Sequence, residues 1–316
     1  MRSYIEGVIS GREQGFLASC YKIIAGLPAI VYAAVLHGRH LCYRFGIFEQ
    51  VKLSVPVVSV GNVVCGGTGK TQLVIALATK LMQKRRVAIV SRGYPVYRGK
   101  PMQVFATSTP NVCGDEPKLL SLRLPDALVV VGRDRVQAAK HAIAQGAEII
   151  ILDDGMQHRR LQRDFEIGIG PSTGAYLPKG RLRDVPSRLK CAHLVLEQTD
   201  LATQPVGVFS LQAEAIEIPK RVSLFCGIGN PERFVKTVEQ MGCEIVHKHL
   251  LADHQNIELK VLKQLAKGVD AVICTEKDWV KLDKNLSLPI CWVKCELELI
   301  GKHAEWNAAL ETIGGL

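Results

Sequence analysis

Short apolar runs alternate with amphipathic stretches along most of the chain, and this alternation predicts the fold class. Runs rich in Val and Ile lie at 57–60, 86–94, 126–132 and 147–155, with helical spacing of apolar residues at 72–85 and 135–145. Apolar strands separated by amphipathic helices are typical of a parallel sheet covered on both faces. We therefore predict an α/β fold with helices on both faces of a parallel sheet.

The same alternation begins again further along the chain and predicts a second, smaller α/β unit. Apolar runs at 221–230 and 271–278 and an amphipathic stretch at 303–313 would form it. Residues 169–190 between the two units are rich in Pro, Gly and Arg, which predicts loops. We place the boundary between residues 200 and 220 and divide the chain into segments 1–50, 51–210 and 211–316.

The first segment contains a nearly uncharged stretch at 16–36, interrupted by Lys22 and Pro28. A membrane-spanning helix needs about 20 apolar residues, so the length is borderline. Arg39 and Arg44 follow and would suit anionic head groups. We expect a membrane-surface helix or hairpin. The alternative is an N-terminal helix packed on its own domain.

A glycine-rich loop follows the first predicted strand and precedes a predicted helix. Its residues are Gly66, Gly67, Thr68, Gly69, Lys70 and Thr71. In this context glycines let backbone N–H groups face phosphate oxygens, while lysine adds a cation and the threonine hydroxyl binds Mg²⁺. The loop therefore predicts binding of ATP or another nucleoside triphosphate with Mg²⁺.

The loop departs from the standard P-loop spacing. Val64 stands where the first glycine of that pattern would be. The stretch CGGTGKT resembles deviant loops that begin with lysine, with Cys65 in the place of that lysine. The alternative is a glycine-rich turn with an incidental lysine.

Two pairs of acids are candidates for metal binding and proton transfer. Asp153 and Asp154 end a predicted buried strand, where the carboxyl edge of a parallel sheet lines the ligand crevice. The alternative is that these two residues belong to a simple turn formed by Asp-Gly. Asp115 and Glu116 precede a predicted helix and could be reactive groups, or could merely cap that helix.

Histidines and arginines add further candidates. His247, His249 and His254 lie in the stretch HKHLLADH, where HxH could bind a metal and His254 could assist an acid–base step. Lone surface histidines are commoner. Arginine binds phosphate through two parallel hydrogen bonds. The arginines near the predicted strand ends are Arg92, Arg133, Arg135, Arg159, Arg160, Arg163, Arg181 and Arg183.

Composition narrows the class of protein without choosing the activity. The 316 residues are 47% hydrophobic, which argues against a disordered chain. Ten cysteines include no CxxC pair, so buried free thiols are expected rather than a disulfide framework or zinc site. The formal net charge of +10 fits nucleic acid, anionic membrane or a phosphorylated substrate.

Several motifs together resemble one known family. In order they are SVGNVVCGGTGKT, SRGY, GDEP, LDDGMQHRRLQRD, LPKGRLRD, ADH and TEKD, between about residues 51 and 281. This set is similar to tetraacyldisaccharide 4′-kinase, the lipid A 4′-kinase of Gram-negative bacteria. The resemblance implies two α/β/α domains and transfer of the ATP γ-phosphate to the 4′-hydroxyl of an acylated glucosamine disaccharide 1-phosphate.

The resemblance also implies roles for individual residues. Asp115 would be the general base and His254 its partner, with Thr71, Asp153, Asp154 and Asp184 around the magnesium. Positions near nucleotide or substrate would be Arg92, Tyr94, Glu116, Arg135, Gln157, His158 and Arg183. Asp184 replaces a common glutamate, Gln72 a usual proline and Pro95 a common glycine.

The resemblance further implies a place of action and a set of partners. We expect a monomer at the cytoplasmic face of the bacterial inner membrane, peripheral or anchored by its N-terminus, acting on an acylated lipid and binding no nucleic acid. One alternative is a regulatory or partitioning ATPase with a deviant loop. Position 65 is a cysteine and not the lysine of such loops, which argues against a regulatory or partitioning ATPase. A nucleic-acid-dependent ATPase is supported by charge alone.

Overall fold

The first of two sheets contains the strands predicted in the first half of the chain. The fold is a computed structural model that describes residues 2–11, 13–93 and 99–316. The described residues form a seven-stranded sheet that is parallel except at one edge, where β3 runs antiparallel to β4. In sheet order its strands are β3 (Met102–Val104), β4 (Leu128–Val131), β2 (Val87–Ser91), β5 (Ile149–Asp153), β1 (Val57–Asn62), β6 (Phe165–Ile169) and β7 (Leu194–Leu196).

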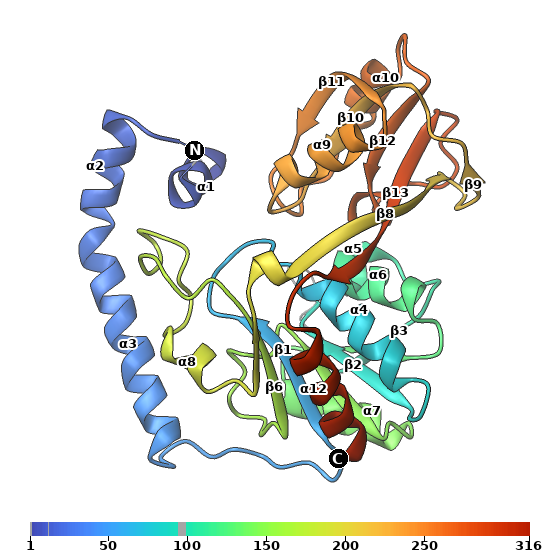
Figure 1. The fold of residues 1–316 in the computed structure, drawn as a ribbon. Coiled ribbons are helices and arrows are strands. Elements are labelled where there is room, and N and C mark those ends of the chain that lie inside the picture. The colour runs from blue at the N-terminus through green and yellow to red at the C-terminus, as the bar shows by residue number, and fades with distance from the viewer. Residues whose placement is uncertain (1, 12, 94–98) are drawn as a thin grey trace.

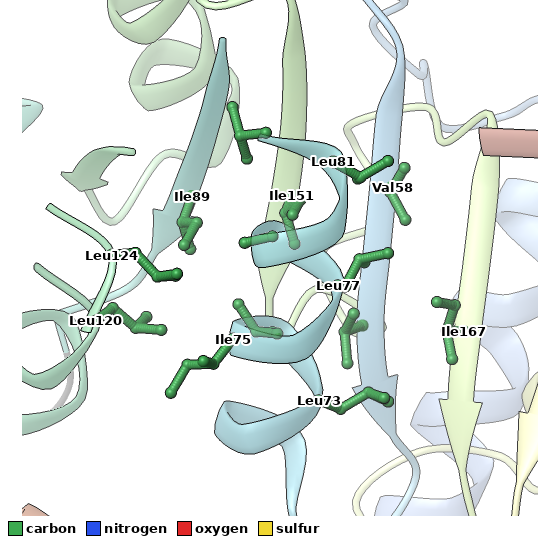
Figure 2. Close-up of a cluster of buried hydrophobic side chains, with 14 of the residues drawn as sticks. Val58, Leu73, Ile75, Leu77, Leu81, Ile89, Leu120, Leu124, Ile151 and Ile167 are labelled. Atoms are coloured by element: carbon green, nitrogen blue, oxygen red, sulfur yellow. The ribbon is translucent and has the colours of Figure 1, made fainter. Parts of the chain in front are cut away.

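The two faces of this sheet account for the continuous apolar runs. Alternate residues of one strand enter different core clusters, as Val58 and Val57 of β1 do. Leu73 and Leu77 of helix α4 (Lys70–Leu81) cover the face that includes Val58 (Figure 2). Because both faces are buried, an unpaired polar residue within a central strand would lower the stability of the fold. This explains why the strands are continuous apolar runs. The predicted α/β fold with helices on both faces is therefore confirmed.

Helices cover the two faces of the first sheet unequally. The face beneath α4 is also covered by α6 (Asp115–Arg123), which the short α5 (Pro110–Cys113) precedes. The opposite face is covered by α7 (Arg135–Ala144). The Asp134 side chain accepts hydrogen bonds from the first turn of α7, which fixes where that helix starts. The short α8 (Ser187–Lys190) lies in the predicted loop region.

The second sheet contains six strands among the described residues. β11, β10, β12 and β13 are parallel neighbours, and β8 and β9 extend the sheet in antiparallel pairings. The strands are β11 (Glu244–Leu250), β10 (Arg221–Cys226), β12 (Ala271–Thr275), β13 (Ile290–Leu299), β8 (Leu201–Ser210) and β9 (Ala215–Ile216). Its helices are α9 (Pro231–Gln240), α10 (Leu259–Leu265) and α11 (Glu276–Trp279), and a 3₁₀ turn, η1 (Gln198–Asp200), precedes β8.

The chain crosses between the two sheets twice, along β8 and β13 (Figure 1). The second sheet therefore begins at Leu201, earlier than the expected division at 210/211. After β13, helix α12 (His303–Gly315) returns to the first sheet, where Trp306 and Ile313 join the core beneath α4. We expected this helix in the second unit, which was wrong, because an amphipathic pattern shows that a face is buried but not against what.

Of the N-terminal helices, α2 and α3 run along one side of the first unit, and α1 turns back from the end of α2 (Figure 1). They are α1 (Arg2–Ser10), α2 (Phe16–Ile24) and α3 (Gly26–Arg44). Polar contacts tie α3 to the first unit, since the Tyr32 hydroxyl donates to the Arg183 carbonyl at 3.1 Å and Arg39 donates to the Gln157 carbonyl at 2.7 Å. In the described part of the chain no helix alone has the length and apolarity to cross a membrane. The pair α2 and α3, bent by 42°, meets both criteria together.

Candidate active site

The glycine-rich loop joins β1 to α4 at the carboxyl edge of the first sheet. Gly66 and Gly69 have φ of +103° and +89°, a region that side chains rarely adopt. Asn62 at the end of β1 donates to the Thr68 hydroxyl at 2.7 Å and so braces the loop from within. Lys70 begins α4 directly after Gly69, so the positive end of the helix faces the loop. These are the features of a phosphate-binding loop.

Arg181 supports the loop from outside and was not singled out individually by the sequence. Its Nε donates to the Cys65 carbonyl at 2.9 Å, while its own carbonyl accepts from the Cys65 amide at 2.8 Å. A Cβ on Gly66 would lie 2.3 Å from Arg181 Nη2. Burial raises the pKa of the Cys65 thiol, so it is neutral and brings no charge in the place of the lysine of deviant loops.

Asp154 lies beside Lys70 and Arg183. Its Oδ1 is 3.6 Å from Lys70 Nζ, and both carboxylate oxygens contact the Arg183 guanidinium, with Nη1 to Oδ2 at 2.7 Å. Burial opposes charge on this carboxylate, but Lys70 and Arg183 outweigh burial and lower its pKa to about 2. Asp154 also has φ +54°, a left-handed conformation that Asp adopts more readily than most residues other than glycine. The side chain is thus a fixed anion beside the loop lysine.

Asp153 ends β5 and is almost completely buried. The hydroxyl of Ser91, at the end of β2, donates to Asp153 Oδ2 at 3.0 Å. Burial is the main cause that raises the Asp153 pKa to about 7, and Glu116 and Asp154 add to it. An incoming cation would favour the ionised form of Asp153.

Gln157 and Asp184 lie beside Asn62 at the base of the loop, and His158 follows Gln157 in the chain. Gln157 Nε2 donates to the Asn62 carbonyl at 2.8 Å and reaches Asp184 Oδ2 at 3.4 Å. Burial, then Arg135 and Arg163, lower the His158 pKa to about 4, so this ring is neutral at pH 7. Asp184 and Gln157 thus lie next to the strand end from which the loop begins, whereas the charged neighbours of His158 are arginines outside the loop.

Two further predicted arginines differ in exposure. Arg135 is buried at the start of α7 and donates to the Gly132 carbonyl at 3.0 Å, whereas Arg92, just after β2, is exposed. Burial lowers the Arg135 pKa to about 10, with Asp153 and Asp154 opposing, so it remains a cation. Tyr94 lies outside the described residues.

Asp115 and His254 come together from different units. Asp115 is the first residue of α6, and His254 follows β11 in the second unit. His254 Nδ1 lies 3.3 Å from Asp115 Oδ2. Gly114, rather than either acid, is the N-cap residue of α6. A carboxylate and an imidazole in contact are suited to proton transfer.

Lys277 lies beside this contact, although the sequence gave no reason to single it out from the motif TEKD. Its Nζ is 3.2 Å from Glu116 Oε1, 3.0 Å from Asp253 Oδ1 and 3.3 Å from His254 Nε2. A second pair joins the same two helices, because Arg123 of α6 donates to Glu276 of α11 at 2.8 Å. The two units are therefore joined by charged contacts beside the site.

The loop after β10 reaches the glycine-rich loop directly. A Cβ on Gly229 would lie 2.5 Å from the backbone nitrogen of Gly67. Asn230 then caps α9 by accepting from the Arg233 amide. This close backbone approach explains a glycine at 229, and it places the second unit against the phosphate loop.

Other predicted candidates are not brought to this site by the contacts of the structure. His247 and His249 lie on β11, with His247 exposed. Arg163 pairs instead with Glu166, and Arg160 with Asp134. Among the described residues, no group of three His, Cys, Asp or Glu side chains is arranged to hold a metal ion unaided. Within the histidine-rich stretch, His254 is the residue brought to this site.

Comparison with known proteins agrees with this arrangement. The family model described as tetraacyldisaccharide-1-P 4′-kinase matches residues 24–314. A tetraacyldisaccharide 4′-kinase of Vibrio vulnificus is 38% identical over 274 residues, covering 80% of this chain and 81% of that protein. One of Chromobacterium violaceum is 35% identical, covering 86% of each.

A solved structure is also similar. LpxK from Aquifex aeolicus, in complex with ATP, superposes with a TM-score of 0.77 at 26% identity, covering 91% of this chain and 98% of that one. The family match spans nearly the whole chain, and the relatives exceed 30% identity over most of their length. This chain belongs to the tetraacyldisaccharide 4′-kinase family.

Proposed function

We propose that this kinase transfers the γ-phosphate of ATP to the 4′-hydroxyl of a tetraacyldisaccharide 1-phosphate in lipid A biosynthesis. Family membership and the names of the relatives support the substrate, and the ATP complex of the Aquifex aeolicus structure supports the nucleotide. The observation that carries the proposal is the contact of Asp115 with His254 beside a phosphate-binding loop.

Nucleotide binding would use the backbone of Gly66, Gly67, Thr68 and Gly69. Their amides and the first turn of α4 would hold phosphate oxygens, and Lys70 would neutralise charge at the γ-phosphate. Lys70 Nζ lies 3.6 Å from Asp154 Oδ1, which would keep the lysine near the loop. Phosphate would then replace Asp154 as the partner of Lys70. Arg92, Arg135 and Arg183 supply the remaining positive charge near the phosphates.

The oxygen donors at this edge of the sheet fit magnesium. Mg²⁺ prefers oxygen ligands and is usually held by one or two carboxylates together with waters and substrate phosphates, so a complete protein cage is not needed. Asp153 and Thr71 would hold it, with Asp154 and Asp184 as the neighbouring carboxylates. When bound, the ion would neutralise charge that develops on the transferred phosphoryl group.

Asp115 would act as the general base of the transfer. The acceptor O–H bond breaks and its proton passes to the Asp115 carboxylate, while the acceptor oxygen bonds to the γ-phosphorus. The bond between that phosphorus and the β,γ-bridging oxygen breaks, and ADP leaves. His254 would orient the carboxylate. Glu116, Gln157, His158 and, from the resemblance alone, Tyr94 would shape the surrounding pocket.

The helices α2 and α3 would hold the enzyme on the membrane where its acylated substrate resides. Large apolar side chains on them are exposed, among them Ile23, Ile24 and Leu27, each more than 70% exposed. Several large apolar side chains exposed together on neighbouring helices suit insertion among acyl chains. We propose a monomer at the cytoplasmic face of the inner membrane, with segment 1–50 as its anchor, the first sheet together with α12 as its kinase domain, and the second sheet, from Leu201, as its C-terminal domain.

A transfer assay tests this function. [γ-³²P]ATP is incubated with tetraacyldisaccharide 1-phosphate in detergent, comparing wild type, Asp115→Asn and the control Asp126→Asn, which alters an exposed acid. We expect labelled lipid with wild type and the control, and a loss of kcat of about 10²–10⁴-fold for Asp115→Asn with ATP affinity retained. ATP hydrolysis without labelled lipid in wild type would instead favour the regulatory ATPase.

A further inference from the structure

Lys277 contacts three side chains beside the Asp115–His254 contact, one of them His254 itself. It projects from α11 of the second unit, and only 15% of its side chain is exposed. Its three neighbours are Glu116 Oε1, Asp253 Oδ1 and His254 Nε2, at 3.0 to 3.3 Å. An ammonium carries three protons, so one lysine can donate to all three atoms at once.

The charge of Lys277 is secure despite its burial. Burial alone would lower the Lys277 pKa, but Glu116 and Asp253 outweigh it and raise the pKa above the ordinary lysine value. The side chain is therefore a cation throughout the physiological range. An ammonium has no lone pair and can only donate hydrogen bonds.

Because the Lys277 ammonium can only donate, it restricts which nitrogen of the His254 ring can carry the proton. Nε2 of His254 faces the ammonium, so it must accept through its lone pair, and the ring proton must then lie on Nδ1. Nδ1 lies 3.3 Å from Asp115 Oδ2, where a proton on it can be donated to the carboxylate. Asp253 Oδ2, at 3.7 Å from Nε2, would favour a proton on that nitrogen instead, but Lys277 holds Asp253 through Oδ1.

We propose that Lys277 is a positioning residue that fixes His254 as the Nδ1–H tautomer and thereby directs a hydrogen bond onto the Asp115 carboxylate. The geometry of four charged or polar side chains carries this inference: Glu116, Asp253, His254 and Lys277. Its consequence for catalysis rests on the proposed role of Asp115 as the base. With Nδ1–H donating to Oδ2, the Asp115 carboxylate is held in one orientation, and its other oxygen remains available for the acceptor proton.

A simpler role for Lys277 would be to join the two units through Glu116, and matched variants separate the two roles. Lys277→Met removes the cation and keeps an apolar stem, leaving Asp253 near Nε2. Lys277→Arg restores a donor-only cation. Lys281→Met is the structural control, because Lys281 is a buried lysine nearby whose partners are Asp278 and the Gln255 carbonyl rather than the histidine.

The decisive measurement is the tautomer of His254 in the full-length protein. Long-range ¹H–¹⁵N spectra of ¹⁵N-histidine-labelled enzyme report which ring nitrogen carries the proton, and His254→Gln identifies the resonance. We expect Nδ1–H in wild type and Lys281→Met, and a proton on Nε2 in Lys277→Met. An Nε2–H ring in wild type would overturn the proposal without any variant having to fold.

Kinetics connect the tautomer to the reaction. Lys277→Met should lower kcat about tenfold or more with little change in the KM for ATP, and Lys277→Arg should recover part of the loss. Retention of both the Nδ1–H tautomer and the wild-type kcat in Lys277→Met would reject the positioning role. The spectra need no substrate, so absence of lipid phosphorylation in wild type would reject the proposed function and leave the tautomer result standing.

Discussion

The phosphate loop and the Asp115–His254 contact lie beside one another but are built in different ways. The loop is one continuous segment braced by residues of the first unit, such as Asn62 and Asp154. The contact joins residues 139 positions apart, from two units. The loop therefore depends on local backbone conformation, whereas the contact depends on how the units meet. Substitutions in the loop should therefore impair phosphate binding and transfer, whereas substitutions at the contact between units should change how the two units are placed relative to each other.

The largest effect is expected from the loop lysine. Lys70→Met removes the cation that would neutralise the γ-phosphate, and we expect kcat/KM to fall about 10³-fold, or about 4 kcal/mol. Steady-state phosphate transfer measures this loss. Lys80→Met, on the exposed face of the same helix, is the control and should behave as wild type. A loss below tenfold would mean that Lys70 does not contact the reacting phosphate.

The charged contact between α6 and α11 comes next. Arg123→Met leaves Glu276 buried without its cation partner, which we expect to lower the free energy of unfolding by about 3 kcal/mol. Denaturant unfolding followed by tryptophan fluorescence measures it. Because removing both charges removes the unpaired anion, Arg123→Met/Glu276→Leu should recover most of the stability. Equal losses in the single and double variants would count against this explanation.

The backbone approach between the units predicts an effect on activity alone. In Gly229→Ala the new methyl would meet the Gly67 nitrogen at 2.5 Å, so the second unit must shift away from the loop. We expect kcat to fall about 10²-fold, or about 2.7 kcal/mol, because small displacements of reacting groups are costly. Gly314→Ala in α12, where a Cβ meets nothing within 4 Å, is the matched control. Unchanged kcat would show that the units need not meet here.

The smallest effect is expected outside both regions, at the apolar face of α2 and α3. Ile23→Ser/Leu27→Ser should raise the apparent KM for the acylated substrate in mixed micelles about tenfold, because burying such side chains in lipid is favourable. The KM for ATP should not change. Val206→Ser, an exposed apolar residue of β8, serves as the control. A similar rise in the control would point to general instability instead.

Local patterns were sufficient for the loop and for several elements, but they did not predict the strands β3, β6, β7, β8, β11 and β13. The strand expected at 147–155 is β5, Ile149–Asp153, and the helix expected at 135–145 is α7, Arg135–Ala144. The prediction of β5 succeeds because a strand buried on both faces needs a continuous apolar run. The prediction of α7 succeeds because Asp134, next to the first turn, fixes where the helix starts. Binding of phosphate by a glycine-rich loop is likewise a property of consecutive residues, so sequence reasoning reaches it.

Contacts between distant segments required the tertiary structure. Helix α12 has an apolar face that the sequence reveals, but only packing shows that Trp306 joins the core beneath α4. Lys277 in the motif TEKD resembles any surface lysine until Glu116 and His254 are seen on either side of it. The sequence by itself determined which residues could bind phosphate and accept a proton. Only the tertiary structure decided which of them meet, because hydrogen bonds and ion pairs depend on distances that chain order does not specify.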